Sequence, residues 1–183
     1  MSFECLKADK RRTTLLRHWT EWMREADRWY CRYVEEVGES PFDFHEVAAV
    51  GFLSAAAARA GFLTLNEYQL YKRSQNDFRK WVPGRADLWM LKDGTSYSFE
   101  FKRAWYRATL GNLRRTMETV RGDIKAVPPD ECHYAAGGVI AFVKDAERAS
   151  KYEEFSNSSD VDVAYRIGPQ NGGGAFLFFS IKS

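Results

Sequence analysis

The stretch GRADLWMLKDGTSYSFEFKR, residues 84–103, decides the fold. Asp93 and Gly94 in its middle are a strong hairpin signal, because a two-residue type I′ turn needs positive φ at both central residues. The run 96–102 after the turn alternates polar and aromatic residues, which is the period of a half-buried strand. The stretch therefore predicts two antiparallel strands joined by a tight turn.

The turn also sets the register of the two strands. With Asp93 and Gly94 as the loop, Asp87 faces Glu100, and their Cβ atoms lie about 5 Å apart. Lys102 shares the face of Glu100, because side chains repeat every second residue along a strand. One face is thus predicted to carry Asp87, Glu100 and Lys102. The other face is a candidate core face, and it carries Leu88, Met90, Phe99 and Phe101.

The polar face has the side chains needed for a particular chemistry. Two adjacent carboxylates repel each other when both are ionised, so one pKa rises unless a cation lies between them. Mg²⁺ is the usual cation, since it takes carboxylate oxygens and keeps several waters. A lysine beside the pair can hold or polarise a metal-bound water. These are the groups used in metal-assisted hydrolysis of a phosphodiester.

Asp87 followed by Glu100-Phe101-Lys102 resembles the signature of the PD-(D/E)xK nuclease superfamily. The proline that precedes the aspartate in that signature is Ala86 here. The resemblance implies that Asp87, Glu100 and the main-chain carbonyl of Phe101 hold Mg²⁺, for which Mn²⁺ can substitute. It also implies that Lys102 orients or activates the attacking water.

Glu46 is a candidate for a further acidic group near the metal. In many members of the superfamily, a glutamate on the helix before the sheet has this role, and Glu67 is a weaker candidate for it here. The alternative for Glu46 is a solvent-facing glutamate that compensates the helix dipole.

Length and composition restrict the class of protein. The 183 residues are enough for one domain with a real core. The net charge is only +2, so contact with nucleic acid would come from a local basic patch. Three scattered cysteines exclude a disulfide framework or a cysteine-rich zinc site, and a reducing cytoplasm is the expected compartment. No apolar run approaches the length of a membrane span.

A long amphipathic helix is predicted over 10–37, where aromatic and apolar residues recur at three- and four-residue steps. Gly38 is the predicted end of this helix. We interpret its aromatic stripe first as core packing. The alternative is a dimer interface or a helix that faces nucleic acid, with aromatic residues for stacking and arginines for phosphates.

A second helix is predicted to begin at Ser40-Pro41, since serine is a favoured N-cap and proline suits the first helical position. It is predicted to run to about Ala60, before Gly61. A strand over 62–71 and a polar loop over 74–83 follow. The cationic residues around this loop have two interpretations, as part of a solvated connector or as charges near the site; they are Lys72, Arg73, Arg79 and Lys80.

After the hairpin, a third helix is predicted over 107–126, with an apolar stripe and a basic ridge. Two interpretations of the ridge stay open: a surface helix with salt bridges, or a phosphate-binding surface beside the site. The candidate phosphate-binding residues are Arg103, Arg114, Arg115 and Arg121. The apolar run 137–143 is typical of a central strand buried on both faces. A short helix in 151–159 and two closing strands, 161–167 and 175–181, complete the chain.

The predicted order matches the common core of the superfamily, αβββαβ, over about residues 41–143. The sequence therefore predicts an α/β, restriction-endonuclease-like fold with a mixed sheet. Residues 40–143 would form the core of a single nuclease-like domain. Residues 1–39 would add an N-terminal helix, and residues 144–183 a C-terminal helix and strand pair.

The expected function is that of a Mg²⁺-dependent nuclease that acts on nucleic acid, with DNA as the expected substrate. A homodimer through the N-terminal helix, or membership of a larger assembly, is the expected quaternary arrangement. The alternatives are a non-catalytic subunit of the same fold that binds nucleic acid or protein, and an unrelated α/β protein with a structural Asp–Lys–Glu cluster. Two facing carboxylates argue against the binding subunit, because they would repel a phosphate backbone.

Overall fold

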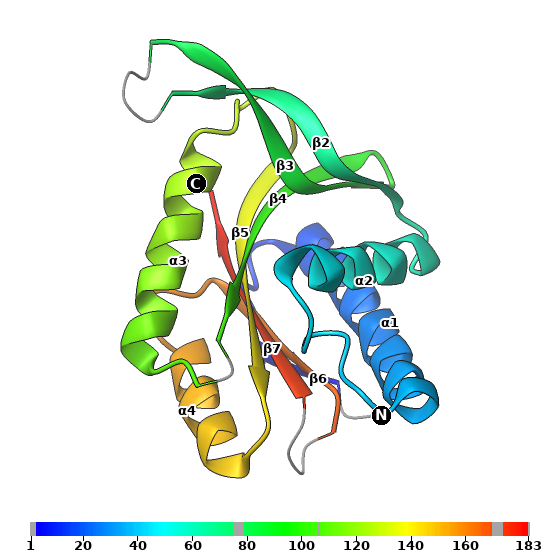
Figure 1. The fold of residues 1–183 in the computed structure, drawn as a ribbon. Helices are drawn as coiled ribbons and strands as arrows, with labels where there is room; N and C mark the ends of the chain where they lie inside the picture. Colours follow the sequence, from blue (N-terminus) through cyan, green and yellow to red (C-terminus); the bar gives the residue numbers. More distant parts are fainter. Residues whose placement is uncertain (1–2, 75–78, 106, 170–173, 183) are drawn as a thin grey trace.

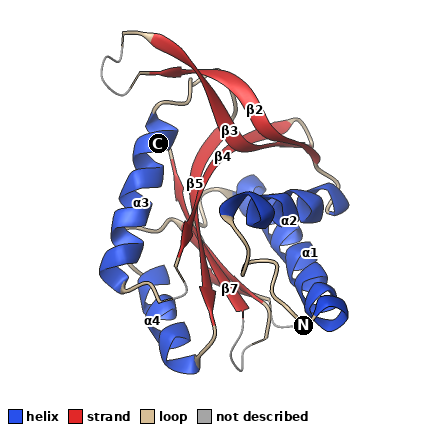
Figure 2. Cartoon of the chain, viewed as in Figure 1, coloured by secondary structure: helices blue, strands red, loops and turns tan. Residues whose placement is uncertain are grey.

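The structure is a computed structural model that describes residues 3–74, 79–105, 107–169 and 174–182. Over these residues the chain forms four helices and seven strands (Figures 1 and 2). The helices are α1 (Thr13–Val37), α2 (Glu46–Arg59), α3 (Leu110–Lys125) and α4 (Ala146–Ser156). The strands are β1 (Glu4–Lys7), β2 (Leu63–Arg73), β3 (Trp81–Lys92), β4 (Thr95–Ala104), β5 (Tyr134–Val143), β6 (Val163–Ile167) and β7 (Gly174–Ile181).

All described strands belong to one mixed sheet, in the order β1-β6-β7-β5-β4-β3-β2. Among them, β4 and β5 form the parallel pair, and the other neighbours are antiparallel. The central strand β5 is therefore parallel to one neighbour and antiparallel to β7. The predicted α/β class and mixed sheet are confirmed. The C-terminal strand pair is confirmed too, and it lies in the same sheet as the predicted core.

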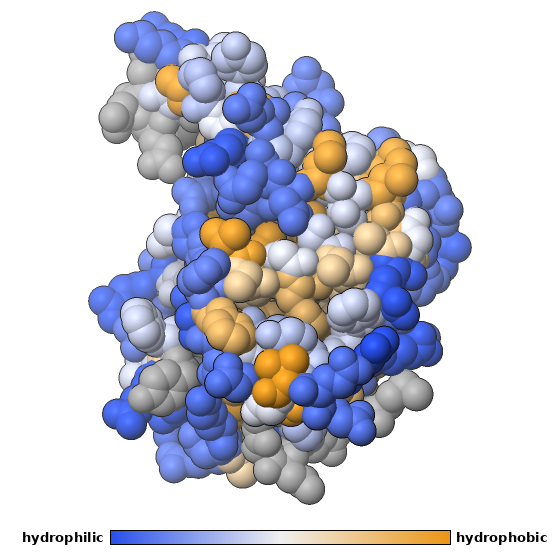
Figure 3. Space-filling model, turned by 45° about the vertical axis from the view of Figure 1, so that its right-hand side comes forward, coloured by the Kyte–Doolittle hydropathy of each residue, from blue (hydrophilic) through white to orange (hydrophobic). Residues whose placement is uncertain are grey.

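The sheet is covered on both faces (Figure 1). Helices α1 and α2 pack on one face and α3 and α4 on the other, with a separate apolar cluster under each pair. Exposed apolar side chains remain on the α2 and β2 side, at Val47, Leu63 and Leu65. Figure 3 shows orange patches there among hydrophilic neighbours. No helix in the described ranges is long and apolar enough to cross a membrane.

The first helix confirms the interpretation of its aromatic stripe as core packing. Leu15, Trp19, Trp22 and Tyr30 are buried, and the Trp19 ring lies 4.8 Å from that of Phe179 in β7, centroid to centroid. The helix ends where predicted, with Gly38 at φ +81° in the left-handed conformation that glycine adopts without strain. A homodimer through this helix stays a prediction, and it would use the exposed face of the helix instead of the stripe.

The predicted hairpin register is confirmed from Lys92–Thr95 to Leu88–Phe99. Asp93 and Gly94 both have positive φ, at 48° and 74°, as the two-residue turn requires. The predicted core face of the hairpin is fully buried, with Leu88, Met90, Phe99 and Phe101 each at 0 % exposure.

The second helix begins later than predicted, at Glu46. Ser40 caps a tight turn instead, since its hydroxyl accepts a hydrogen bond from the amide of Phe42 at 3.1 Å. That turn buries Phe42, whose ring stacks on Tyr30. His45 is the N-cap of the helix and accepts from the amide of Ala48. Burial of one aromatic ring thus outweighs a good local helix start.

The connection between β2 and β3 is shorter than the predicted loop. Lys72 and Arg73 lie in β2, and β3 begins at Trp81. The distal part of this hairpin, residues 69–73 and 81–85, projects beyond the rest of the sheet and is called the arm below (Figure 1). Residues 75–78 of the predicted loop lie outside the described residues.

Other element boundaries also differ from the prediction. The third helix starts at Leu110, because Thr109 and Asn112 form a capping box there. Helix α4 starts at Ala146 and not near residue 151, with Asp145 as its N-cap. Strand β1 was not predicted, and it pairs with β6 at the edge of the sheet.

Two glycines in β5 let its neighbours pack closely. A Cβ at Gly137 would lie 2.7 Å from Cγ2 of Val120, so α3 rests directly on this strand. A Cβ at Gly138 would collide with the ring of Phe101. Gly122, in contrast, lies on the exposed side of α3 with no atom within 4 Å of an added Cβ.

Substitution of these glycines by alanine should have opposite effects. We expect Gly137→Ala to destabilise the protein by about 1–3 kcal/mol, because Val120 and the backbone of α3 must move. The matched variant Gly122→Ala should stabilise it by up to about 1 kcal/mol through helix propensity. Urea denaturation midpoints measure both. A Gly137→Ala variant as stable as wild type would contradict the close packing of α3 on β5.

Candidate active site

The candidate site lies where β3 and β4 separate. Their paired ladder ends at Leu88–Phe99. One residue beyond, the side chain of Asp87 reaches β4, where its Oδ2 accepts a hydrogen bond of 2.6 Å from the amide of Phe101. Asp87 therefore joins the two strands after the ladder has ended, and its carboxylate lies beside the main chain of the Glu100–Lys102 segment.

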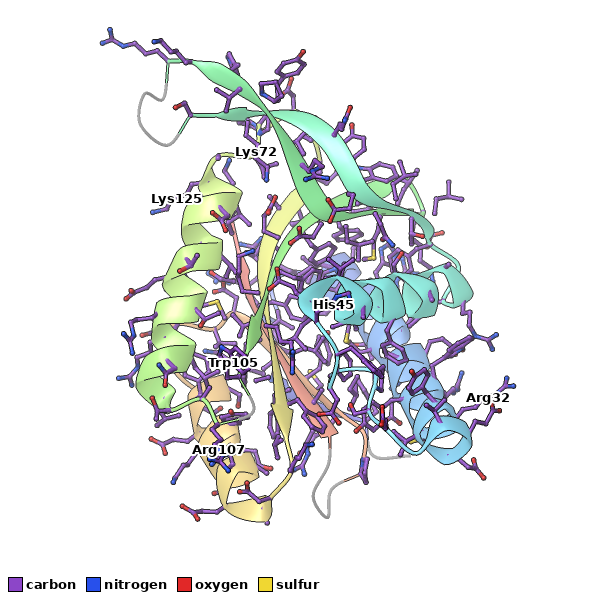
Figure 4. The ribbon with its side chains drawn as sticks, in the orientation of Figure 1. Arg32, His45, Lys72, Trp105, Arg107 and Lys125 are labelled. Carbon is purple, nitrogen blue, oxygen red and sulfur yellow. The ribbon has the colours of Figure 1, made fainter. Side chains whose placement is uncertain are left out.

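Glu100 is buried on the inner side of the arm. It is 5 % exposed, and its Oε1 accepts a hydrogen bond from the ammonium of Lys72 in β2. Gly84 in β3 makes room for this lysine, because a Cβ there would lie 2.8 Å from Cδ of Lys72. Figure 4 shows Lys72 on the side of the arm that faces the C-terminal end of α3.

Lys102 is held from two sides. Its Nζ donates to the carbonyl oxygen of Phe101 at 2.9 Å and lies 3.4 Å from Oε1 of Glu46. The other carboxylate oxygen of Glu46 accepts from the amide of Arg103 at 2.8 Å. Glu46 is the first residue of α2, so the helix dipole favours its negative charge. Glu46 therefore fixes both the end of β4 and the ammonium of Lys102.

Burial controls the protonation of these groups. It raises the pKa of Glu100 to about 7, although the hydrogen bond and charge of Lys72 act in the opposite direction. Burial also raises the pKa of Asp87, against the hydrogen bond from Phe101. For Lys102, burial lowers the pKa, but the charges of Glu46 and Asp87 outweigh it and leave the pKa raised. Two carboxylates with raised pKa values thus lie near a lysine whose pKa is also raised.

Three cavities border the site. One of about 350 Å³ is lined by Lys72, Glu100 and Asp123 among others. A second of about 480 Å³ begins at Lys102 and follows α3. The third, of about 80 Å³, includes Asp87 together with Glu46 and Glu67. Solvent or a ligand can therefore approach the predicted residues from more than one direction.

Glu67 has an unusual backbone conformation opposite Asp87. Its φ is +51°, inside a strand whose register with β3 is the same on both sides of it. A non-glycine residue in this region is strained, and such strain is found mostly where the surroundings fix the conformation. Its carboxylate pairs with Arg85 at 3.1 Å, and its charge raises the pKa of Asp87.

The predicted phosphate-binding arginines do not lie together. Arg103 and Arg115 line the cavity of about 480 Å³. Arg114 and Arg121 both contact Asp160, at 3.6 and 3.3 Å, and Arg121 also donates to Ser180 in β7. The basic ridge on α3 is therefore divided into a salt-bridged part and a part that faces the cavity. Phosphate binding by any of them stays a prediction.

Two charged residues at the site lie outside the predicted set of site residues. For Lys72, the interpretation as a charge near the site is confirmed, because it is the partner of Glu100. Asp123 on α3 raises the pKa of both Glu100 and Lys102. No local motif marks either residue, because β2 and α3 reach the site only through the fold of the sheet.

Oxygen ligands for a hard cation are available at the site. Asp87 Oδ1 makes no hydrogen bond to any described residue, and Glu100 contributes a second carboxylate, whose pKa the charge of Asp87 raises. No group of three or more His, Cys, Asp or Glu side chains in the described ranges is arranged to hold a metal ion. Mg²⁺ is commonly bound through one or two carboxylates with waters and substrate phosphate, so the donor set fits this ion.

No family model, curated protein or solved structure matches this chain.

Replacement of Glu100 by glutamine tests the cost of ionising this buried group. Because its pKa is raised to about 7 in the folded protein, the native state binds more protons than the unfolded chain as pH rises from the ordinary glutamate pKa to that value. The stability that this group contributes is present at low pH, and it is lost as pH rises from the ordinary glutamate pKa to about 7. In EDTA, above about pH 8, Glu100→Gln should be more stable than wild type by about 1–3 kcal/mol. This difference in stability should become smaller as the pH is lowered.

The control is Glu147→Gln on α4, where the hydrogen bond from Lys151 lowers the pKa of an exposed carboxylate. This variant should gain no stability over wild type at alkaline pH. The measurement is the urea denaturation free energy of each variant across the pH range. A Glu100→Gln variant less stable than wild type at every pH would show that the ion pair with Lys72 outweighs the cost of burial.

Proposed function

We propose that this protein is a metal-dependent nuclease with a restriction-endonuclease-like fold, and that it hydrolyses phosphodiester bonds of nucleic acid, with DNA as the expected substrate. The observation that carries the proposal is the position of the Lys102 ammonium. It contacts the carboxylate of Glu46 and the carbonyl of Phe101, at the place where Asp87 and Glu100 extend beyond the β3–β4 ladder. The order α2-β2-β3-β4-α3-β5 supports the same fold.

The residues have separate roles in this proposal. Asp87, Glu100 and the carbonyl of Phe101 would hold Mg²⁺ or Mn²⁺. A bound cation supplies charge stabilisation on the phosphate and lowers the pKa of its water. Lys102 orients the attacking water through its ammonium, and Glu46 is the positioning residue that holds that ammonium. Binding of a cation by Glu100 requires its ion pair with Lys72 to open or shift.

A second candidate is favoured by one observation. In the described residues, Lys72 pairs with Glu100 and the amide of Phe101 binds Asp87, so both carboxylates have protein partners. In a non-catalytic subunit that binds nucleic acid or protein, this cluster would be structural. The two candidates differ in whether Asp87 is needed to bind Mg²⁺.

Lys102→Ala should reduce nuclease activity at least about 100-fold, because the group that orients water is lost. Cleavage of plasmid, linear duplex, single-stranded DNA and RNA is measured with Mg²⁺ or Mn²⁺. The matched control is Lys151→Ala, which removes an exposed lysine from the far helix α4 and should cut like wild type. Equal cutting by wild type and Lys102→Ala would reject the site.

Calorimetry with Mg²⁺ or Mn²⁺ separates the two candidates. The proposal expects a binding site in wild type that Asp87→Asn removes, with an unchanged far-ultraviolet circular dichroism spectrum. Folded wild-type protein that neither binds the cations nor cuts any substrate would support the non-catalytic subunit.

A further inference from the structure

A cationic groove with an exposed tryptophan adjoins Lys102. This is the cavity of about 480 Å³ between the end of β4 and the N-terminal half of α3. Its charged lining residues are Lys102, Arg103, Arg107 and Arg115, and no acidic residue lines it among those described. The remaining lining includes Trp105 and uncharged polar side chains of α3. The charge of the groove therefore suits a polyanion.

Trp105 presents its ring to solvent at the edge of this groove. It is 77 % exposed, and it makes no ring contact with any described residue. Its main chain is held in place, because its carbonyl accepts a hydrogen bond of 2.8 Å from the amide of Ala108. A lone exposed apolar side chain is ordinary. This one is distinctive because an indole, which can stack on a base, borders a cavity whose charged groups are all cations.

The positive charge of the groove is only partly neutralised within the protein, where Lys102 pairs with Glu46. Arg115 has no ion pair among the described residues, whereas Arg114, its neighbour in sequence, pairs with Asp160. The Nε of Arg103 is a buried donor with no hydrogen-bond partner. Arg115 thus remains available to an anionic ligand, and Arg103 has a hydrogen-bond donor that no described residue uses.

The groove is continuous with the candidate active site. Trp105 follows Lys102 by three residues, about 10 Å of extended chain. Figure 4 shows Trp105 and Arg107 at the N-terminal end of α3, and Lys72 and Lys125 at its C-terminal end. Lys102 itself lines the groove, so a strand bound there would lie beside its ammonium.

We propose that this groove binds a single-stranded segment of nucleic acid, with one base stacked on Trp105 and an adjoining phosphate on Arg115. Stacking on an aromatic side chain needs an unpaired base, because the faces of bases inside a duplex are already covered. A purely electrostatic groove would bind a duplex at least as well as a single strand. The inference rests on the proposed nuclease function and assigns it a single-stranded substrate.

Binding in EDTA, where metal-dependent cleavage cannot occur, tests the proposal. The probes are a fluorescein-labelled oligothymidylate of about twelve nucleotides and a blunt duplex of equal length. Wild type should prefer the single strand in fluorescence anisotropy titrations. Trp105→Ala should weaken binding of the single strand by about 5- to 150-fold and change duplex binding less than about twofold, and Trp105→Phe should retain most of the affinity. The matched control is Trp81→Ala on the arm, which should bind like wild type.

The salt dependence of binding tests the arginines. Arg115→Gln should weaken binding of both probes and lower the slope of log affinity against log salt by about 1, as expected for one lost phosphate contact. Arg32→Gln is the control, because Arg32 is also exposed, lies at the far end of α1 (Figure 4) and pairs with Glu36. Its slope should equal that of wild type.

Any of three results would overturn the proposal. Wild type could bind the duplex more strongly than the single strand, or fail to bind the single strand. Trp105→Ala could lose affinity for both probes equally. The proposed nuclease is judged separately. Lys102-dependent cleavage without a preference for single strands would leave the nuclease standing and reject the groove. Binding that depends on Trp105 in a protein that cuts no substrate would support the groove and reject the nuclease.

Discussion

The hydrogen bond from the amide of Phe101 to the carboxylate of Asp87 is the contact on which the candidate site depends. Beyond the last paired residues of β3 and β4, the side chain of Asp87 connects the two strands. The same residue, Phe101, is fixed on its other side by its ring, which packs next to Gly138 and against Phe179. The carbonyl that Lys102 contacts therefore belongs to a residue held by both backbone and side chain.

The charges around this contact come from elements on different sides of the sheet. Glu46 reaches it from the start of α2, Lys72 from the arm, and Asp123 acts on it from α3. Each of them either forms a hydrogen bond with a charged group on the Asp87–Lys102 hairpin or shifts the pKa of such a group. The positive φ of Glu67 opposite Asp87 adds local strain. Such an arrangement costs stability, and functional sites are where proteins commonly accept that cost.

Features with a local cause could be predicted from the sequence. The hairpin register followed from Asp93-Gly94, the packing face of α1 from its periodicity, and the end of that helix from Gly38. Features that depend on distant burial or pairing could not. Ser40 and Pro41 favour a helix, but burial of Phe42 outside any helix decides where the chain turns. Lys72 adjoins a predicted polar loop, and only the pairing of β2 with β3 brings its side chain to Glu100.

The place of β7 in the sheet has a consequence for biosynthesis. This strand lies between β6 and β5 and contributes Phe179, whose ring contacts Trp19, Phe99 and Phe101. The ribosome completes β7 about eighty residues after the Asp87–Lys102 hairpin, counted along the chain. The sheet lacks one of its inner strands, and the ring of Phe101 lacks its contact with Phe179, until that strand has been translated. A nascent chain would therefore carry the chemical groups of the site for some time without their native arrangement.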